Sequence, residues 1–367
     1  YNITHQHQYL MESQMSNKFL STTSAFLLST SMLVADVPKV TVDIAPVHSL
    51  VSSVMEGVGK PDLIMPAGAS PHEYQLKPSN AKSLEDADVV FWIGEDLTPW
   101  LENGLESLAK NASKTSLLGV DGIELLSFRE GALFEAHDHG DHDDHGDHDD
   151  HDDHDDHDHG KKKHDDHDDH DDHDDHDDQD HGKKKHDDHD DHEGHAHGEH
   201  DPHAWLSPKI AKVWLNSIAA KLSEVDPDNA ATYFSNAKSA RDNIDALVSE
   251  VNSILDPIRE KKFVVFHDAY QYFEKDFGIS ASGAISLGDA SDPSPARLAE
   301  IRKRVVDEAV ECVLAEPQYK QGLVKAVVEG TNANTAVIDP LGVKLETGPS
   351  LYENLIRNLA TNLAKCF

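Results

Sequence analysis

Basic residues are scarce in this chain of 367 residues, which has 32 Lys and Arg against 69 Asp and Glu and a formal net charge of −37. Phosphate recognition needs clustered positive charge, so we expect no nucleic-acid partner. The acidic excess is concentrated in residues 137–200, the His/Asp tract, which holds 27 Asp and 2 Glu but only 6 Lys. The rest of the chain is only moderately acidic.

The sequence also lacks the usual signatures of enzymes. It contains no HExxH motif, and we find no activated nucleophile and no paired general acid and base. We therefore expect a protein that binds a ligand without carrying out covalent chemistry.

Long apolar runs are missing as well. The best candidate, residues 19–35, is diluted by Ser and Thr and is too short to span a membrane. It follows Met15 and Lys18, and a basic start before a short apolar core predicts an export signal cleaved near Ala35. No cysteine lies at that point, which disfavours a lipoprotein. We expect a periplasmic protein, and residues 1–14, upstream of a plausible start, are left out of the fold.

Cysteine is limited to Cys312 and Cys366. In an oxidising compartment two thiols usually pair, and a bridge here would tether the C-terminal end to the core. Two buried free thiols are the alternative.

The remaining residues predict an α/β fold. Without the signal and the tract about 270 residues remain, which exceeds a typical single core and suggests two lobes. Strands are expected at residues 39–44, 61–65, 89–93, 263–266, 279–284, 312–315 and 335–338. Helices are expected at residues 47–55, 79–87, 99–108, 208–225, 270–276, 295–309, 322–329 and 350–365. This alternation indicates two parallel sheets covered by helices.

A long helix separates the two halves. Asp228 can cap a helix that runs toward Leu255, and a helix of about 28 residues spans roughly 40 Å, which suits a strut between lobes. A helix packed on one lobe is the simpler interpretation. Apolar residues at helical spacing are Ala231, Phe234, Ala237, Ala240, Ile244, Leu247 and Val251. The expected divisions are 1–35 (upstream residues and signal peptide), 36–136 (N-terminal lobe), 137–200 (His/Asp-rich loop), 201–227 (end of the N-terminal lobe), 228–257 (linking helix) and 258–367 (C-terminal lobe).

The His/Asp tract repeats the unit His-Asp-Asp, and it holds 21 of the 27 histidines. The repeat has no apolar residue, so it cannot offset its conformational entropy by burial, and we expect disorder. Residues three apart in an extended chain lie roughly 9 Å apart, too far for two nitrogens on one zinc ion without bending. We expect several weak, exchangeable metal sites, or else a solvated insert without a role. Representative ligands are His164, His167, His170, His195, His197 and His200.

Outside the tract, few histidines remain, and their positions are informative. They are His5, His7, His48, His72, His203 and His267. The first two fall in the excluded segment. We interpret His48 as structural because no second polar partner lies nearby in the sequence.

The other three histidines predict a metal site. His72 comes soon after the strand at 61–65 and His267 directly after the strand at 263–266, while His203 follows the tract. Asp339 follows the strand at 335–338. Open parallel sheets bind ligands outside the carboxyl ends of their strands. Three imidazoles with one carboxylate or water form a tetrahedral zinc set, and nitrogen donors favour zinc over manganese or calcium.

At these residues the sequence resembles a known family. The segments GASPHEYQLKPS, DPHAWLSP, FVVFHDAYQYFEKDFG, CVLAEPQ and VIDPLG resemble, in order and spacing, the periplasmic zinc-binding proteins of bacterial ABC importers, the ZnuA type of metal-binding solute-binding proteins. The resemblance covers nearly all of the chain after the signal. It implies two α/β lobes joined by a long backbone helix, with the metal in the cleft between the lobes. It also implies a His-rich loop where the tract lies.

The resemblance implies that His72, His203 and His267 are the metal-binding histidines. Among them His267 matters most, because manganese-binding relatives tend to have a carboxylate at that position. Asp339 matches the carboxylate that many relatives use as a fourth ligand, with Glu73 or water as alternatives. Some zinc members use a Glu before the first histidine, but this chain has Pro71 there. Cys312 and Cys366 match a disulfide of some zinc members.

These observations predict a zinc-binding importer component. It would capture periplasmic Zn²⁺ as a monomer and deliver it to an ABC permease in the inner membrane. A manganese or iron importer component is the nearest alternative. A zinc buffer without a transporter and a zinc-dependent hydrolase or lyase are more distant ones, and the enzyme lacks support from any catalytic motif.

Overall fold

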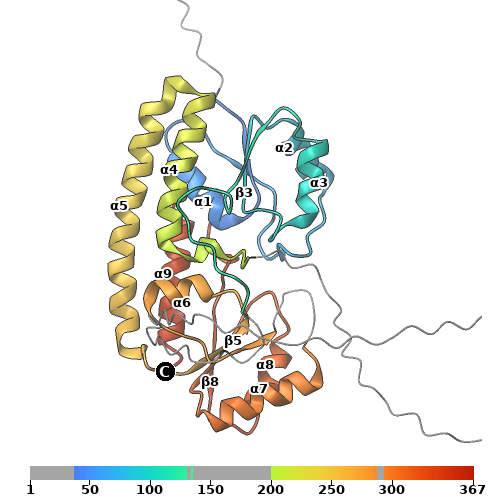
Figure 1. Ribbon diagram of the computed structural model, residues 1–367, viewed down its shortest axis with the longest axis vertical. Helices are drawn as coiled ribbons and strands as arrows, with labels where there is room; N and C mark the ends of the chain where they lie inside the picture. The colour runs from blue at the N-terminus through green and yellow to red at the C-terminus, as the bar shows by residue number, and fades with distance from the viewer. Residues whose placement is uncertain (1–36, 130–133, 135–199, 287–292) are drawn as a thin grey trace, which may run out of the picture. The chain divides into compact units, whose positions relative to one another are not determined.

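The computed structural model describes residues 37–129, 134, 200–286 and 293–367 (Figure 1). These residues form an α/β fold with two lobes, each built on a four-stranded parallel sheet. The segment predicted as an export signal, and all of the tract except His200, lie outside the described residues. No helix among the described residues is long and apolar enough to cross a membrane.

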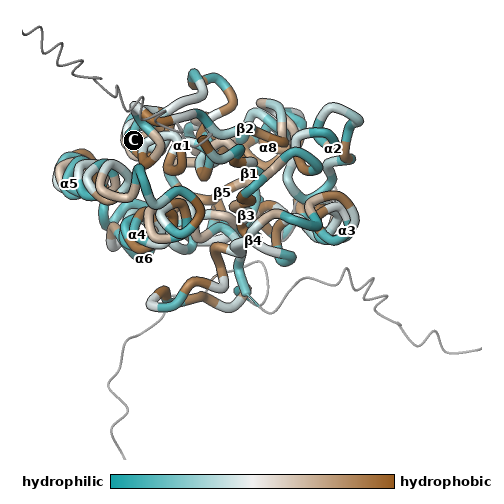
Figure 2. The backbone as a smooth tube through the Cα atoms, turned by 90° about the horizontal axis from the view of Figure 1, so that it is seen from above, coloured by the Kyte–Doolittle hydropathy of each residue, from teal (hydrophilic) through white to brown (hydrophobic). Residues whose placement is uncertain are grey.

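The first lobe contains the sheet with the strand order β2-β1-β3-β4. Its strands are β1 (Val40–Val42), β2 (Asp62–Leu63), β3 (Val89–Trp92) and β4 (Ser113–Ser116), and its helices are α1 (Ala45–Val54), α2 (Pro78–Glu85) and α3 (Pro99–Ser107). The strands β1 and β3 are buried at every position. This burial agrees with helices on both faces of a parallel sheet (Figure 2).

The second lobe repeats this arrangement with the order β6-β5-β7-β8. Its strands are β5 (Phe263–His267), β6 (Ala284–Ser286), β7 (Cys312–Ala315) and β8 (Asn334–Val337), and its helices are α6 (Gln271–Phe277), α7 (Pro295–Asp307), α8 (Gln321–Val328) and α9 (Leu351–Ala364). Alternate residues of β5 join different hydrophobic clusters, Val264 and Phe266 on the side of α7 and α8 and Val265 on the other. Both faces of this sheet are therefore packed.

Two long helices connect the lobes. Three-residue 3₁₀ turns at Ala204–Leu206 and Pro227–Asn229 flank α4 (Pro208–Val225), and another at Asp256–Ile258 follows α5 (Ala230–Leu255). With 26 residues, α5 is about 39 Å long. It packs against α1 and α4 and also against α6 and α9, so it runs along both lobes (Figure 1). This confirms the prediction of a long linking helix.

Some predicted details of the chain were wrong. In α5, Tyr233 is buried, whereas Phe234, placed on the apolar face by its spacing, is 50% exposed. Further along α5 the predicted apolar face is correct, because Ala237, Ile244, Leu247 and Val251 are all buried. The polar strand β4 was not predicted, because its sequence SKTS carries no apolar signal and it lies at a sheet edge. The strand expected at 279–284 lies at Ala284–Ser286.

A disulfide joins Cys312 to Cys366, with a Cα–Cα distance of 5.8 Å. Cys312 begins β7 and Cys366 follows α9, so the bridge ties the end of the chain to a central strand of the second sheet. Asn334, on the adjacent strand β8, donates a hydrogen bond of 2.8 Å to the carbonyl of Cys366. The pairing of the two thiols is thereby confirmed over two free cysteines.

Candidate metal site

His267 is the last residue of β5, in the middle of the second sheet. Only 4% of the residue is exposed. Its Nδ1 lies 2.7 Å from Oε1 of Glu316, which directly follows the neighbouring strand β7 and is itself buried. Two adjacent parallel strands thus deliver a histidine and a carboxylate to the same edge of the sheet.

His203 is held in a similar way by Asp201. The Asp201 Oδ1 atom accepts a hydrogen bond from the backbone N–H of His203 at 2.9 Å and lies 2.7 Å from its Nδ1. The other oxygen, Oδ2, accepts from Nε2 of Gln271 at 3.1 Å, and the hydroxyl of Tyr272 donates to the Asp201 carbonyl at 2.9 Å. His203 is therefore attached, through Asp201, to helix α6 of the second lobe.

The carboxylates determine which nitrogen each of these rings presents. A carboxylate beside Nδ1 favours the tautomer with the proton on Nδ1, and this leaves a lone pair on Nε2. The Nε2 atom of His203 is buried and has no hydrogen-bond partner within the described residues. A buried polar atom without a partner is costly, and a bound cation would satisfy it. This carboxylate–histidine arrangement is typical of metal ligands in proteins.

His72 comes from the first lobe, on the loop between β2 and α2, and it is partly exposed. Its backbone N–H donates to Oγ of Ser70 at 3.3 Å. The preceding carbonyl, of Pro71, accepts from Nε1 of Trp100 on α3 at 2.7 Å. The loop is thus attached to its own lobe, while the side chain of His72 lies in the same pocket as His203 and His267.

The three predicted histidines lie together in one pocket with an empty volume of about 270 Å³. The His203 ring centroid is 5.6 Å from that of His72 and 5.3 Å from that of His267. Imidazoles bound to one tetrahedral zinc at 2.0–2.1 Å have centroids roughly 5 Å apart. As they stand, no three or more His, Cys, Asp or Glu side chains in the described ranges meet the geometry for holding an ion. The spacing is close to that of a shared ligand set but slightly wider.

The predicted fourth ligands, Asp339 and Glu73, are not among the residues that line this pocket. The Oδ1 of Asp339 accepts hydrogen bonds from the backbone N–H groups of Leu341 and Gly342 at 3.1 and 3.0 Å, and its Oδ2 accepts from Val343 at 2.6 Å. Glu73 is exposed and also lies outside the pocket lining. Asp339 therefore organises the loop after β8, which the sequence did not predict.

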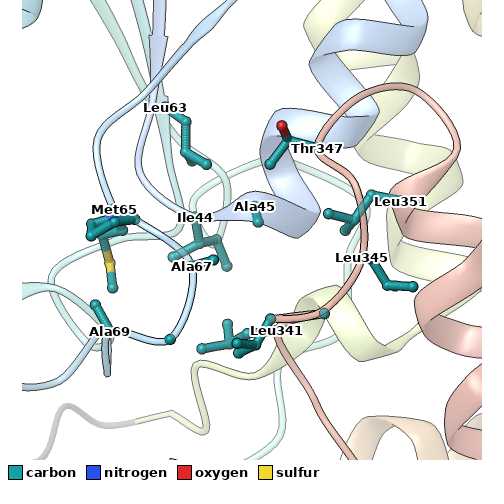
Figure 3. Close-up of a pocket in the computed structure, with 14 residues that line it drawn as sticks. Ile44, Ala45, Leu63, Met65, Ala67, Ala69, Leu341, Leu345, Thr347 and Leu351 are labelled. Atoms are coloured by element: carbon teal, nitrogen blue, oxygen red, sulfur yellow. The ribbon is translucent and has the colours of Figure 1, made fainter.

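That loop closes one side of the site with apolar residues. Pro340 and Leu341 line the histidine pocket, and the Pro340 carbonyl accepts from Nε1 of Trp205 at 2.8 Å. Leu341 also lines an adjacent apolar cavity with an empty volume of about 370 Å³, whose lining combines Leu345 with Ile44 and Met65 of the first lobe (Figure 3). On this side the lining limits access of solvent to the site, and it offers no metal ligand of its own.

A charged cluster lies beside the histidines. Arg129 bonds to both Asp268, which directly follows His267, and Glu274 on α6. Burial raises the pKa of the Asp268 carboxyl, while Arg129 opposes that shift. For Arg129, burial favours the neutral form, but the charges of Glu274 and Asp268 outweigh it and raise the pKa of the guanidinium. The cluster therefore keeps its ion pairs within a largely buried setting.

The sequence prediction missed Asp201, Glu316 and Arg129. Two signals could have found the carboxylates: Glu316 follows a buried strand just as His267 does, and Asp201 lies two residues before His203. No local pattern marks Arg129. Of the representative tract histidines, His164, His167, His170, His195 and His197 lie outside the described residues. His200 forms an isolated antiparallel bridge with Ser127 and is not in the pocket.

His48, which the sequence predicted to have a structural role, forms hydrogen bonds within the first lobe. Its Nε2 lies 3.0 Å from the carbonyl of Pro61, and the Ser52 hydroxyl lies 3.4 Å from its Nδ1. It is absent from the lining of the histidine pocket. The arrangement ties α1 to the segment before β2.

Comparisons with known proteins agree with this fold. The sequence model of the family described as "Zinc-uptake complex component A periplasmic" (ZnuA) matches residues 40–366. A high-affinity zinc uptake system protein ZnuA from Brucella abortus (strain 2308) is 45% identical over 345 residues, covering 94% of this chain and 96% of the relative. One from Paracoccus denitrificans (strain Pd 1222) is 44% identical over 333 residues, covering 90% and 92%.

Solved structures support the same fold. A crystal structure of ZnuA aligns with a TM-score of 0.65 at 20% sequence identity, and it covers 90% of this chain and 99% of that one. At 20% identity, this structural similarity supports the fold alone. Membership of a family is supported by the match to the family model and by the two relatives. The chain belongs to the ZnuA family, the periplasmic A component of zinc-uptake complexes.

Proposed function

We propose that this protein captures Zn²⁺ in the periplasm and delivers it to the permease of a zinc ABC importer, with His72, His203 and His267 as the ligands. Zinc is the cargo, and no covalent step is needed. The family membership supports the role, and the high-affinity zinc uptake proteins it resembles support zinc as the ion. We further propose that the protein acts as a monomer and reaches the periplasm by means of the export signal predicted in residues 1–35.

One observation carries the ligand assignment: two of the three imidazoles each have a buried carboxylate 2.7 Å from Nδ1. Such partners fix the orientation of a ligating histidine and make it more basic. A histidine with only a packing role would not need a buried charge beside it, because a neutral acceptor satisfies Nδ1–H at a lower desolvation cost. The third imidazole, of His72, closes the set from the other lobe.

The donor set favours zinc over manganese. Three neutral nitrogens in an apolar surrounding suit a borderline cation, whereas manganese prefers oxygen ligands. The carboxylates near the site, Asp201 and Glu316, are engaged with ring nitrogens and support the histidines. Because imidazoles must be deprotonated to bind, zinc affinity falls as the pH is lowered.

For the fourth position we favour water over Asp339 or Glu73. The two oxygens of Asp339 already accept three backbone hydrogen bonds, and moving the carboxylate to the metal would leave those N–H groups without their acceptor. A water molecule requires no such rearrangement. It also exchanges readily, which suits an ion that must be released.

We assign the His/Asp tract an auxiliary role. Its composition supports several weak sites that raise the zinc concentration beside His203 or report zinc status. These sites remain separate from the site formed by the three histidines. Under this proposal, deletion of residues 137–199 removes weak binding and lowers zinc uptake under starvation, but leaves one tight site in place.

The experiment is a zinc titration of the mature protein with chelator-buffered metal. The full chain, a variant without residues 137–199 and the His267→Ala variant are compared. Loss of the tight site in His267→Ala, with weak sites retained, supports the proposal. Tight binding that disappears only when the tract is deleted would contradict it. Uptake in a strain that lacks the permease separates an importer component from a simple zinc buffer.

A further inference from the structure

Arg129 connects the segment before the His/Asp tract to the second lobe by a buried double fork. Its Nε lies 3.0 Å from both carboxylate oxygens of Asp268, and its terminal nitrogens lie 2.9 and 3.0 Å from the two oxygens of Glu274. The side chains of all three residues are largely buried, with exposed fractions of 12%, 6% and 6%. A single guanidinium thus binds two carboxylates, a geometry that lysine does not reproduce.

The two carboxylates belong to the corner between β5 and α6. Asp268 directly follows the proposed ligand His267, at the point where β5 ends. Glu274 lies on α6, and its Oε2 also accepts the backbone N–H of Ala281 at 3.0 Å, just before β6. The fork therefore fixes the chain on both sides of this corner.

A second proposed ligand, His203, is fixed at the same corner. Gln271, at the start of α6, donates to both the carbonyl of Ser127 and the Oδ2 of Asp201, each at 3.1 Å. The backbone N–H of Asp201 donates to the Leu126 carbonyl at 2.8 Å. Asp201 in turn holds His203. The segment 126–129 therefore touches the supports of both histidines.

A stacked aromatic ring limits the movement of the guanidinium. The Arg129 Cζ lies 3.6 Å from the centre of the Phe134 ring, which is 6% exposed. The Phe134 carbonyl accepts from a terminal nitrogen of Arg304 on α7 at 2.9 Å. Stacking suits a planar cation, so the site is shaped for arginine as well as for positive charge.

We infer that Arg129 is a positioning residue for the zinc site, holding His203 and His267 at the spacing that one tetrahedral ion requires. The inference rests on the proposed ligand set. The physical reason is that two ligands on separate segments bind one ion tightly only if their positions relative to each other are fixed before the ion binds. Without the fork, two buried carboxylates repel each other beside His267, and the corner relaxes.

The test replaces Arg129 by lysine and, separately, by methionine. Arg129→Lys keeps a positive charge but loses the fork, and Arg129→Met removes the charge while keeping much of the length. We expect a zinc Kd about 10–100-fold weaker in both variants, as for other residues that orient metal ligands. The matched control is Arg297→Lys, since Arg297 is 14% exposed in the same lobe and bonds to the carbonyls of Ala284 and Ile285.

A spectroscopic measurement distinguishes positioning from stability. Co²⁺ is bound in place of zinc, and its visible absorption reports the coordination geometry. We expect the bands of Arg129→Lys to shift or broaden at a temperature where circular dichroism shows the variant folded, while Arg297→Lys keeps the wild-type spectrum. A lower Tm with unchanged zinc Kd and an unchanged cobalt spectrum would overturn the inference and leave Arg129 with a structural role.

The same series separates this inference from the ligand assignment. If His267→Ala keeps wild-type affinity, the proposed site itself is wrong. If His267→Ala loses tight binding but Arg129→Lys binds zinc as the wild type does, the site stands and the positioning role of Arg129 falls. If Arg129→Met does not fold, Arg129→Lys alone decides the outcome.

Discussion

The two lobes share one strand order but support their histidines differently. In each sheet the second strand lies at an edge, followed by the first, third and fourth. The second lobe places His267 at the end of a buried strand with Glu316 beside it, and its helix α6 anchors the Asp201 that holds His203. The first lobe supplies His72 from a loop, partly exposed.

This difference suggests that the two lobes contribute differently to binding and release of the ion. Under the proposed ligand set, the second lobe would hold two ligands in a fixed geometry, and the first lobe would supply the third, His72, from a partly exposed loop. The hydrophobic core is continuous between the lobes, and α5 and α9 both belong to it, so a large hinge motion would be costly. Release of the ion is then expected to begin with movement of the His72 loop.

The comparison is tested most strongly by removing one ligand from each lobe. We expect His267→Ala to weaken zinc binding by more than about 100-fold, because a ligand and its buried partner are both lost to the site. His72→Ala should weaken binding less, since the fixed pair remains. Isothermal titration with chelator-buffered zinc measures both, and His48→Ala serves as a control outside the pocket. Equal losses for the two variants would remove the distinction between the lobes.

The disulfide belongs to the second lobe alone and should matter for stability there. The bridge spans 54 residues, and the loop-entropy model gives it roughly 4 kcal/mol at most. We expect the double variant Cys312→Ser, Cys366→Ser to lose about 2–4 kcal/mol of unfolding free energy in urea titrations. Zinc affinity at 25 °C should stay within a few-fold of wild type. A large loss of affinity would mean that the bridge also shapes the site.

The carboxylate partners should have an intermediate effect. Glu316→Gln keeps the shape of the side chain but removes the charge beside His267, and we expect a zinc Kd about 10–100-fold weaker. Asp201→Asn should act similarly through His203. Glu311→Gln is the matched control, because Glu311 pairs with Lys261 on the surface. If Glu316→Gln bound zinc as tightly as wild type, the fixed geometry of the second lobe would not contribute to affinity.

Asp339 offers a test of the fourth position. As an organiser of its loop, Asp339 can be replaced by asparagine with one acceptor oxygen retained, so we expect less than a tenfold change in zinc Kd and a loss of about 1–2 kcal/mol in unfolding free energy. As a direct ligand, it would cost far more affinity when its charge is removed. A loss above 100-fold in titrations at pH 7.5 would restore Asp339 to the ligand set.

The smallest expected effect concerns His48 in the first lobe. Burial lowers the pKa of His48 below its usual 6.5, against the opposing effect of the Pro61 carbonyl. The unfolded chain then binds the proton more readily, so stability that is present above pH 6.5 is lost as the pH falls below it. We expect His48→Gln to reduce this loss by less than about 1 kcal/mol in metal-free urea titrations from pH 7.5 to 5. An unchanged pH slope would contradict this.

The sequence was most informative where strong signals are local. Buried runs such as FVVF and CVLA predicted strands because uninterrupted apolar residues need both faces covered, and the helices were predicted from their spacing. The strand β4 was missed because its edge position permits polar residues. The disulfide could be predicted because the chain has only two cysteines and an expected export signal, which left few alternatives.

In the candidate site, too, the residues with local sequence signals could be predicted and those that depend on distant contacts could not. His72, His203 and His267 could be predicted because histidines are few outside the tract and two of them follow strands. The roles of Asp339 and Arg129 could not, since each depends on contacts with residues far along the chain or on the turn of one loop. Asp339 has the right chemistry for a metal ligand, but its oxygens are directed to backbone N–H groups.

By itself, the sequence determined the α/β class, the long linking helix and the choice of three candidate histidines, because composition, periodicity and residue scarcity are properties of short stretches of chain. The tertiary structure decided which carboxylates support those histidines, that Asp339 shapes a loop, and that Arg129 joins the segment before the tract to the His267 corner. These depend on distances between segments as far apart as Arg129 and Asp268, and only the packing of the folded chain fixes such distances.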